Sequence, residues 1–181
     1  MIQELDNERK LIEECKKGNI NAFEAIYRHF QQPLYSYAMR VLEQREDAED
    51  AIQMTFLKLY RGIKKFKYNA KFSTYLFRIL INVCYDIIAK RKYHESEDLH
   101  ALKITNDQSN DMHLHLDKSI KNLPQRMREC FILYAVEGFP QGEIANMMQL
   151  SIGSVKAHVF QAKQKLRTQL SDYFDEVQDD M

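Results

Sequence analysis

The chain has 181 residues, with 26 basic and 26 acidic side chains, a formal net charge of zero and 45% hydrophobic residues. This hydrophobic fraction supports a packed core and excludes a wholly disordered chain. Only five Gly and three Pro residues are present, so turn signals are few and an all-α protein is indicated. Charged residues interrupt every apolar run well before 18 residues, and the first ten residues lack the apolar core of a signal peptide. We therefore expect a cytoplasmic protein with no membrane insertion.

The balanced net charge hides a strong segregation along the sequence. Residues 1–57 and 93–151 each carry a net charge of −4, whereas residues 58–92 carry ten bases and one acid. Residues 152–171 carry four bases and no acid, and the last ten residues carry five acids and no base. Two basic islands suggest two contacts with nucleic acid, although solvated helix faces would give the same charge runs.

Apolar residues recur at helical spacing from the start of the chain. We predict a helix over residues 5–17 that ends at Gly18, because Gly suits the residue after a helix. Asn21 is expected to cap the next helix, and Pro33 to break or restart it, since proline lacks the backbone donor. A further helix should follow through Leu42.

The segment over residues 45–63 is predicted to be helical, with acids in its first turn and bases near its end, as the helix dipole favours. A long helix is predicted from Asn69 or Ser73 to about Lys92. Aromatic residues alternate with cations through this basic stretch, which is how proteins hold single-stranded nucleic acid. Packing in the core is the competing explanation for at least two of the rings at 72, 75 and 77.

Apolar periodicity is lost over residues 93–117, which predicts a flexible linker between two small helical domains. The domains are expected over residues 1–92 and 118–171, followed by a frayed acidic tail over residues 172–181.

The C-terminal domain carries the signature of a helix-turn-helix. Pro140 suits the first turn of one helix, and Ser151 is a plausible N-cap of the next. The second helix is predicted to bury one stripe at a period of 3.6: Ile152, Val155, Val159, Ala162, Leu166 and Leu170. The opposite face has no acid and combines cations, amides and apolar groups, as a DNA recognition helix requires.

Both halves resemble one known family. GNINAFEAIYRHFQQPLYSYAMRVLEQREDAEDAIQMTFLKLYRGIKKFKYNAKFSTYLFRILINVCYDIIAKRK resembles region 2 of the extracytoplasmic-function (ECF) group of sigma-70-family factors. LPQRMRECFILYAVEGFPQGEIANMMQLSIGSVKAHVFQAKQKLR resembles region 4 of the same group. The resemblance implies a non-enzymatic factor without cofactor or metal. Its partners would be core RNA polymerase (the β′ clamp helices and the β flap), promoter DNA and an anti-sigma factor.

The resemblance also implies roles for individual residues. Asp47, Asp50 and Gln53 match positions that bind core polymerase, with Met54 where the family often has Glu. The residues that match −10 element contacts are Phe66, Lys71, Phe72 and Asn82, with Tyr75 replacing the usual Trp. The residues that match −35 element contacts are Lys156, Ala157, His158, Phe160 and Gln161.

Two of these −35 positions are commonly Arg where this chain has His158 and Gln161, so a distinct −35 preference is expected. The turn of the helix-turn-helix often holds Gly where this chain has Gln149, and a left-handed conformation there would cost roughly 1 kcal/mol. A slightly different turn is therefore expected.

Two other classes of function would fit parts of the sequence. A stand-alone helix-turn-helix regulator would bind duplex DNA without polymerase, and its N-terminal helices would only dimerise. The basic aromatic stretch argues against it, because dimerisation does not require stacking rings beside cations. An enzyme could be imagined around a metal held by His94, His100, His113 and His115, yet these lie in a polar linker with no flanking core. Cys15, Cys84 and Cys130 are far apart, which argues against a disulfide framework or a cysteine-rich zinc site.

Overall fold

The computed structural model describes residues 7–97 and 112–179. The elements in these residues are helical, which confirms the all-α prediction. The N-terminal domain comprises α1 (Glu8–Lys16), α2 (Ile20–Leu42), α3 (Arg45–Gly62), the 3₁₀ turn η1 (Ile63–Lys65) and α4 (Phe72–Glu97). The C-terminal domain comprises α5 (Met112–Lys121), α6 (Gln125–Phe131), the π-helical turn η2 (Ile132–Val136), α7 (Gln141–Met148) and α8 (Ile152–Asp179).

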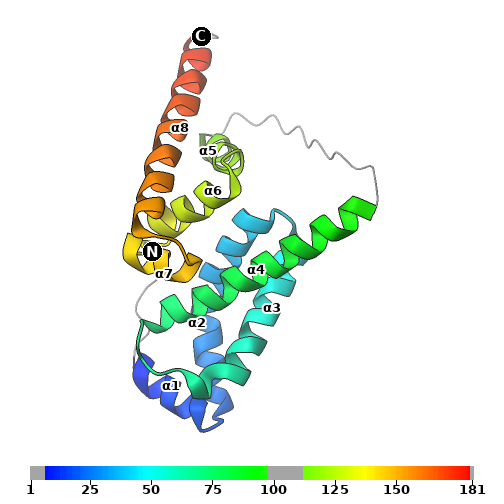
Figure 1. The fold of residues 1–181 in the computed structure, drawn as a ribbon, viewed down its shortest axis with the longest axis vertical. Helices are drawn as coiled ribbons and strands as arrows, with labels where there is room; N and C mark the ends of the chain where they lie inside the picture. Colours follow the sequence, from blue (N-terminus) through cyan, green and yellow to red (C-terminus); the bar gives the residue numbers. More distant parts are fainter. Residues whose placement is uncertain (1–6, 98–111, 180–181) are drawn as a thin grey trace.

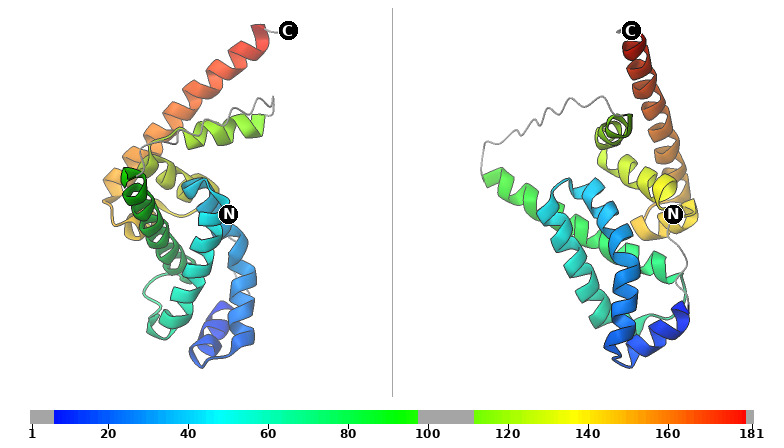
Figure 2. Two further views of the ribbon diagram at one scale, coloured as in Figure 1. Left: turned by 90° about the vertical axis from the view of Figure 1, so that its right-hand side faces the viewer. Right: turned by 180° about the vertical axis from the view of Figure 1, so that it is seen from behind.

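The N-terminal domain is built on three long helices, α2, α3 and α4, which pack against one another (Figures 1 and 2). Buried rings join α2 to α4. The ring centroids of Tyr37 and Phe77 lie 5.7 Å apart, and so do those of Phe30 and Phe72. Each such ring contributes about 1.5–3 kcal/mol by leaving water, and the edge-to-face geometry adds to this.

The start and the middle of α2 differ from the prediction. Asn19, not Asn21, is the N-cap: its Oδ1 accepts hydrogen bonds from the backbone N–H groups of Asn21 at 3.0 Å and Ala22 at 3.4 Å. Pro33 does not break the helix, because α2 continues through it to Leu42. Phe30 and Leu34, on either side of the proline, are 1% and 0% exposed. Packing on both sides therefore outweighs the roughly 3 kcal/mol that an interior proline costs.

The helix α4 is apolar because it is a core helix. By length and a mean hydropathy of 1.3, its segment Phe72–Tyr93 could cross a membrane. In the fold it contacts α2, α3 and α7, and it buries Leu76, Leu80 and Cys84 completely. Burial within the fold covers 44% of this apolar window.

The helix-turn-helix is formed by α7 and α8. The turn residue Gln149 adopts the left-handed conformation (φ 56°, ψ 43°), and the Leu150 N–H donates to the Ala145 carbonyl at 2.9 Å. The Ser151 hydroxyl caps α8 by accepting from the Ser154 N–H at 3.0 Å. The predicted stripe is buried except at its ends, because Ile152 is 51% exposed and Leu170 is half-buried.

Helical structure extends further than predicted into both ends of the linker and beyond residue 171. α4 reaches Glu97 and α5 begins at Met112, so both ends of the predicted linker are helical, and residues 98–111 lie outside the described residues. α8 continues to Asp179, so the predicted acidic tail is helical over its described residues, and its fraying stays a prediction. No Gly or Pro in this stretch ends the helix.

The two domains pack directly against each other. α7 lies against the N-terminal end of α4, and α6 contacts α2 (Figures 1 and 2). The buried side chains of both domains consequently form one continuous cluster.

Candidate nucleic-acid interface

The exposed face of α3 combines polar and apolar groups. Asp50 and Gln53, predicted to bind core polymerase, are both exposed and lie one helical turn apart. Beside them Met54 and Leu57 are 45% and 40% exposed. A depression of about 240 Å³ between α2 and α3 also has Gln53 in its lining. This mixed surface suits a protein partner rather than solvent alone.

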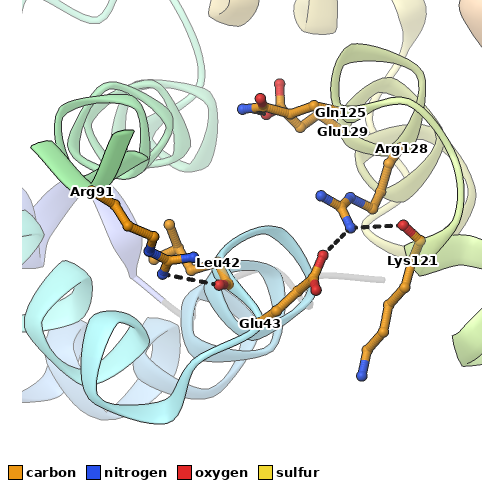
Figure 3. Close-up of polar contacts among 7 residues, drawn as sticks. All are labelled: Leu42, Glu43, Arg91, Lys121, Gln125, Arg128 and Glu129. Atoms are coloured by element: carbon orange, nitrogen blue, oxygen red, sulfur yellow. Dashed lines mark hydrogen bonds and ion pairs between the residues drawn. The ribbon is translucent and has the colours of Figure 1, made fainter. Parts of the chain in front are cut away.

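Asp47 has a different environment from Asp50 and Gln53. Its carboxylate forms an ion pair with Arg91 of α4, and these side chains are only 27% and 29% exposed. Arg91 also donates to the Leu42 carbonyl at 3.2 Å (Figure 3). Asp47 therefore joins the start of α3 to α4, and the structure separates it from the exposed pair with which it was predicted to act.

The basic loop, residues 63–71 between α3 and α4, is anchored to α1. The Tyr68 hydroxyl donates to Glu13 at 2.7 Å, and the Lys16 ammonium lies 4.4 Å from the Tyr68 ring centroid. Burial, followed by the hydrogen bond to Glu13, raises the pKa of Tyr68 to about 12, so this hydroxyl remains a donor. The anchoring leaves the cations of the loop exposed: Lys64, Lys65, Lys67 and Lys71.

Phe66 and Phe72 do not present their rings to solvent. They are 7% and 1% exposed, and their centroids lie 5.5 Å apart. The half-buried Tyr75 packs against Phe66 with the ring centroids 4.9 Å apart and the planes tilted by 37°. In this fold Phe66 and Phe72 are core residues that support the basic loop. Their contact with the −10 element stays a prediction.

One face of α4 offers groups for a nucleotide chain. Asn82 and Arg78 are exposed four residues apart, and Lys71 is exposed just before the helix begins. Sequence reasoning missed Arg78, although its spacing from Asn82 was a sufficient signal. A pocket of about 420 Å³ opens at this face. Its lining includes Lys65, Lys67, Asn69, Lys71, Tyr75 and Arg78, and, from α7, Glu143, Asn146 and Met147. Cations around an aromatic platform are the elements of a single-strand binding groove.

The exposed face of α8 carries most of its predicted contacts. Lys156, Ala157, Phe160 and Gln161 are exposed, with Phe160 at 61%. His158 is half-buried, and its Nδ1 is buried without a hydrogen-bond partner among the described residues. Its contact with the −35 element stays a prediction. Ile152, 51% exposed in the first turn, was missed because its spacing fitted the buried stripe.

A separate apolar groove of about 560 Å³ lies between α5, α6 and α8. Leu116, Phe131, Leu166 and Leu170 supply its apolar lining, and Lys163 and Arg167 lie at its side. The combination suits an amphipathic helix from a partner protein.

The cysteine side chains have the character of core residues. All three are unpaired and buried, and burial raises the pKa of Cys15 to about 11 and of Cys130 to about 12. Such thiols are poor nucleophiles because the thiolate is suppressed. His94, His100, His113 and His115 lie outside the described side chains, and among the residues described no group of three potential ligands is placed to hold a metal.

Comparison with known proteins finds a sigma-70 family match in each domain. The sigma-70 region 2 family matches residues 26–93, and the sigma-70 region 4 family matches residues 113–166. The ECF RNA polymerase sigma factor SigW of Bacillus subtilis is 29% identical over 181 residues, covering 91% of this chain and 97% of the relative. The ECF sigma-E factor of Escherichia coli is 27% identical, covering 86% and 90%.

Solved structures show the same fold. CnrH, in complex with the cytosolic domain of CnrY, aligns with a TM-score of 0.71 at 24% identity over 91% of this chain and 97% of that chain. The Bartonella quintana sigma factor RpoE, in complex with the anti-sigma factor NepR, gives the same TM-score and identity over 82% and 96%. The two family matches fall on the two domains in the order that the sequence motifs indicated. The chain belongs to the ECF group of the sigma-70 family and is an RNA polymerase sigma factor.

Proposed function

We propose that this sigma factor directs promoter-specific initiation by binding core polymerase through α3 and promoter DNA through two further surfaces. The observation that carries the proposal is that each domain exposes its own DNA-compatible surface. The first is centred on Lys71, Arg78 and Asn82, and the second on Lys156, Phe160 and Gln161. One duplex-binding surface would suffice for a simple repressor.

Asp50 and Gln53 are the residues proposed to contact the β′ clamp helices of core polymerase. Their exposure, together with the apolar Met54 and Leu57 beside them, supports this assignment. The groove between α5, α6 and α8 is proposed to take the β flap, because its apolar lining and flanking cations match a partner helix.

The α4 face is proposed to hold the non-template strand of the −10 element. Lys71 and Arg78 neutralise phosphates, while the Asn82 amide can donate to and accept from the edge of a flipped base. The α8 face is proposed to read the −35 element from the major groove, with Lys156 on phosphate and Gln161 on a base edge.

This role requires no catalysis by the chain itself and places it in the cytoplasm with the polymerase. We also propose that an anti-sigma factor binds it, since the two structurally similar sigma factors are in complex with CnrY and the anti-sigma factor NepR.

Gel shift on a promoter duplex, with and without core polymerase, tests the proposal. Sequence-specific retention should require both the chain and core. Tight specific binding by the chain alone would instead support a stand-alone helix-turn-helix regulator.

A further inference from the structure

The side chains of the basic loop are directed to two different sites. Lys67 and Asn69 belong to the lining of the pocket of about 420 Å³ that opens at the α4 face, where the −10 strand is proposed to bind. Tyr68, between these two residues, is outside that lining, and its ring faces cations of α1 instead. Tyr68 therefore connects the residues that would touch the nucleotide chain to a helix outside the pocket.

The side chain of Tyr68 is fastened to α1 by several contacts at once. Its hydroxyl donates to a carboxylate oxygen of Glu13 at 2.7 Å, and the Lys16 ammonium donates to the same oxygen at 2.9 Å. That ammonium also lies 4.4 Å from the centroid of the Tyr68 ring, and the Arg9 guanidinium carbon lies 5.3 Å from it. Both distances are within the range of a cation–π attraction. Together these contacts form the loop anchor.

The backbone at Tyr68 indicates that the loop anchor is needed. Tyr68 has a φ of 58°, in the left-handed region that glycine adopts freely and that a residue with a side chain adopts at a cost. Such a conformation persists where the surrounding contacts determine it. Because Tyr68 is 37% exposed, burial in the core does not account for it, and the directed contacts of the loop anchor remain as its cause.

The loop anchor is connected to the pocket through Phe66. The rings of Tyr68 and Phe66 meet edge to face, with their centroids 4.9 Å apart. Phe66 is 7% exposed and contacts the ring of Tyr75, and both of these residues belong to the pocket lining. Because a close-packed ring cannot shift without displacing its neighbours, the position of Tyr68 fixes the wall of the pocket as well as the adjacent Lys67 and Asn69.

We propose that Tyr68 is a positioning residue for the −10 element: its anchor to α1 holds the basic loop in the conformation that binds the melted strand. The inference rests on the proposed −10 function of the α4 face. A loop that is already ordered loses less conformational entropy when the strand binds, so the loop anchor should speed promoter opening. Tyr68 acts through the loop, so it should not affect the initial binding of duplex promoter.

Tyr68→Phe, in the holoenzyme formed with core polymerase, tests the proposal. The change removes the hydroxyl that bonds Glu13 and keeps the ring, its cation contacts and its contact with Phe66. Promoter opening should be slowed about threefold to tenfold, as expected for the loss of one hydrogen bond to a charged group. The rate is measured by the fluorescence of 2-aminopurine placed in the −10 element, which rises when a base leaves the stack.

Affinity for the closed promoter separates positioning from a general loss of structure. Gel shift of duplex promoter on ice, where the duplex stays closed, should give the wild-type affinity for the Tyr68→Phe holoenzyme. Tyr134→Phe is the matched control, because the ring of Tyr134 in η2 also has a lysine ammonium over it, that of Lys163 at 4.7 Å from the centroid. This control should alter neither the affinity nor the opening rate.

A double-mutant cycle tests whether the hydroxyl acts through Glu13. Glu13→Ala should slow opening by a similar factor, and the double variant should be no slower than the slower single variant. Glu14→Ala, the same change at the next residue of α1, should open promoters at the wild-type rate. Slowing factors of Tyr68→Phe and Glu13→Ala that multiply in the double variant would overturn the loop anchor.

The outcomes separate the proposal from the function on which it rests. A folded Tyr68→Phe chain whose holoenzyme opens promoters at the wild-type rate, while wild-type holoenzyme retains a single-stranded −10 oligonucleotide, would reject the positioning role alone. Failure of the wild-type holoenzyme to retain that oligonucleotide would reject the proposed −10 function.

Discussion

Some of the side chains predicted to contact DNA or polymerase stabilise the fold, whereas others are exposed and available for recognition. Phe66, Phe72 and Asp47 have the residue types expected of contacts with DNA or polymerase, yet the fold uses them internally. The burial of the two rings depends on how the basic loop lies on α1, and the Asp47–Arg91 ion pair depends on how α3 meets α4. Local spacing in the sequence reveals neither. Asp50, Gln53 and Asn82 are exposed, as a contact role requires.

Asp47 and Asp50 should therefore respond differently to substitution. Asp47→Asn should lower the free energy of unfolding by about 1 kcal/mol, because Arg91 loses a partly buried partner, while changing core affinity little. Asp50→Lys combined with Gln53→Ala should weaken association with core polymerase and leave the melting temperature unchanged. Fluorescence titration with core and thermal denaturation measure the two effects. Glu14→Lys on α1 is the charge-reversal control, and core affinity unaltered in the double variant would contradict the clamp assignment.

The −35 surface predicts two distinct mutant phenotypes. Lys156→Ala should weaken holoenzyme binding to all promoters and reduce its salt dependence, because a phosphate contact is lost. Gln161→Ala should change preference at one base pair by about 1–3 kcal/mol. Competition binding on a set of single-base promoter variants distinguishes these outcomes. Equal losses on every sequence for both variants would contradict base reading by Gln161.

Glu129 gives a pH-dependent prediction. Burial, the largest cause, raises its pKa, while the hydrogen bonds from Tyr85 and Gln125 and the charges of Arg126 and Arg128 act in the opposite direction. Because the folded-state pKa is the higher one, the folded chain binds more protons, and the free energy of unfolding should fall as pH rises from about 4.5 through the raised pKa.

Glu129→Gln should remove this pH dependence and raise the melting temperature at pH 8. A gain of about 1 kcal/mol corresponds to about 2–4 °C for a chain of this size. Thermal denaturation of both proteins from pH 4 to pH 8 measures it. A variant that melts lower than wild type at pH 8 would show that the ionised carboxylate is net stabilising.

At the scale of elements, the helices with strong local signals were predicted well. The 45–63 segment, α4 and the α7–α8 pair were foreseen because capping residues and apolar periodicity agree within each. The continuation of α2 through Pro33 was not predicted, because it depends on packing on both sides of the proline. The C-terminal end of α8 was not predicted either, because the sequence there has no stop signal. The domain limits at 1–92 and 118–171 remain predictions.

The turn of the helix-turn-helix is strained at one residue. Gln149 sits at φ 56°, where a side chain is unfavourable and glycine is not. Gln149→Gly should raise the free energy of unfolding by about 0.5–1 kcal/mol, as measured by chemical denaturation. Gln164→Gly, in the interior of α8, is the matched control and should lower it by about 1 kcal/mol. Destabilisation by Gln149→Gly would show that its side chain makes a compensating contact.

At the scale of the whole molecule, the sequence did not predict the docking of the two domains. Thr74 of α4 donates a hydrogen bond to Glu143 of α7, 69 residues away, and Glu43 pairs with Arg128 of α6, 85 residues away. No periodic or capping signal connects such positions, and the basic stretch was interpreted for DNA alone.

Permanganate footprinting of promoter opening tests the central claim most directly. Unpaired thymines in the −10 element should become reactive only when the chain and core polymerase are both present. Asn82→Ala should reduce this reactivity several-fold without weakening core binding, whereas Asn122→Ala, the same change at an exposed turn away from the proposed surfaces, should have no effect. A folded Asn82→Ala protein that opens promoters at the wild-type rate would contradict the account, as would a wild-type holoenzyme that opens none.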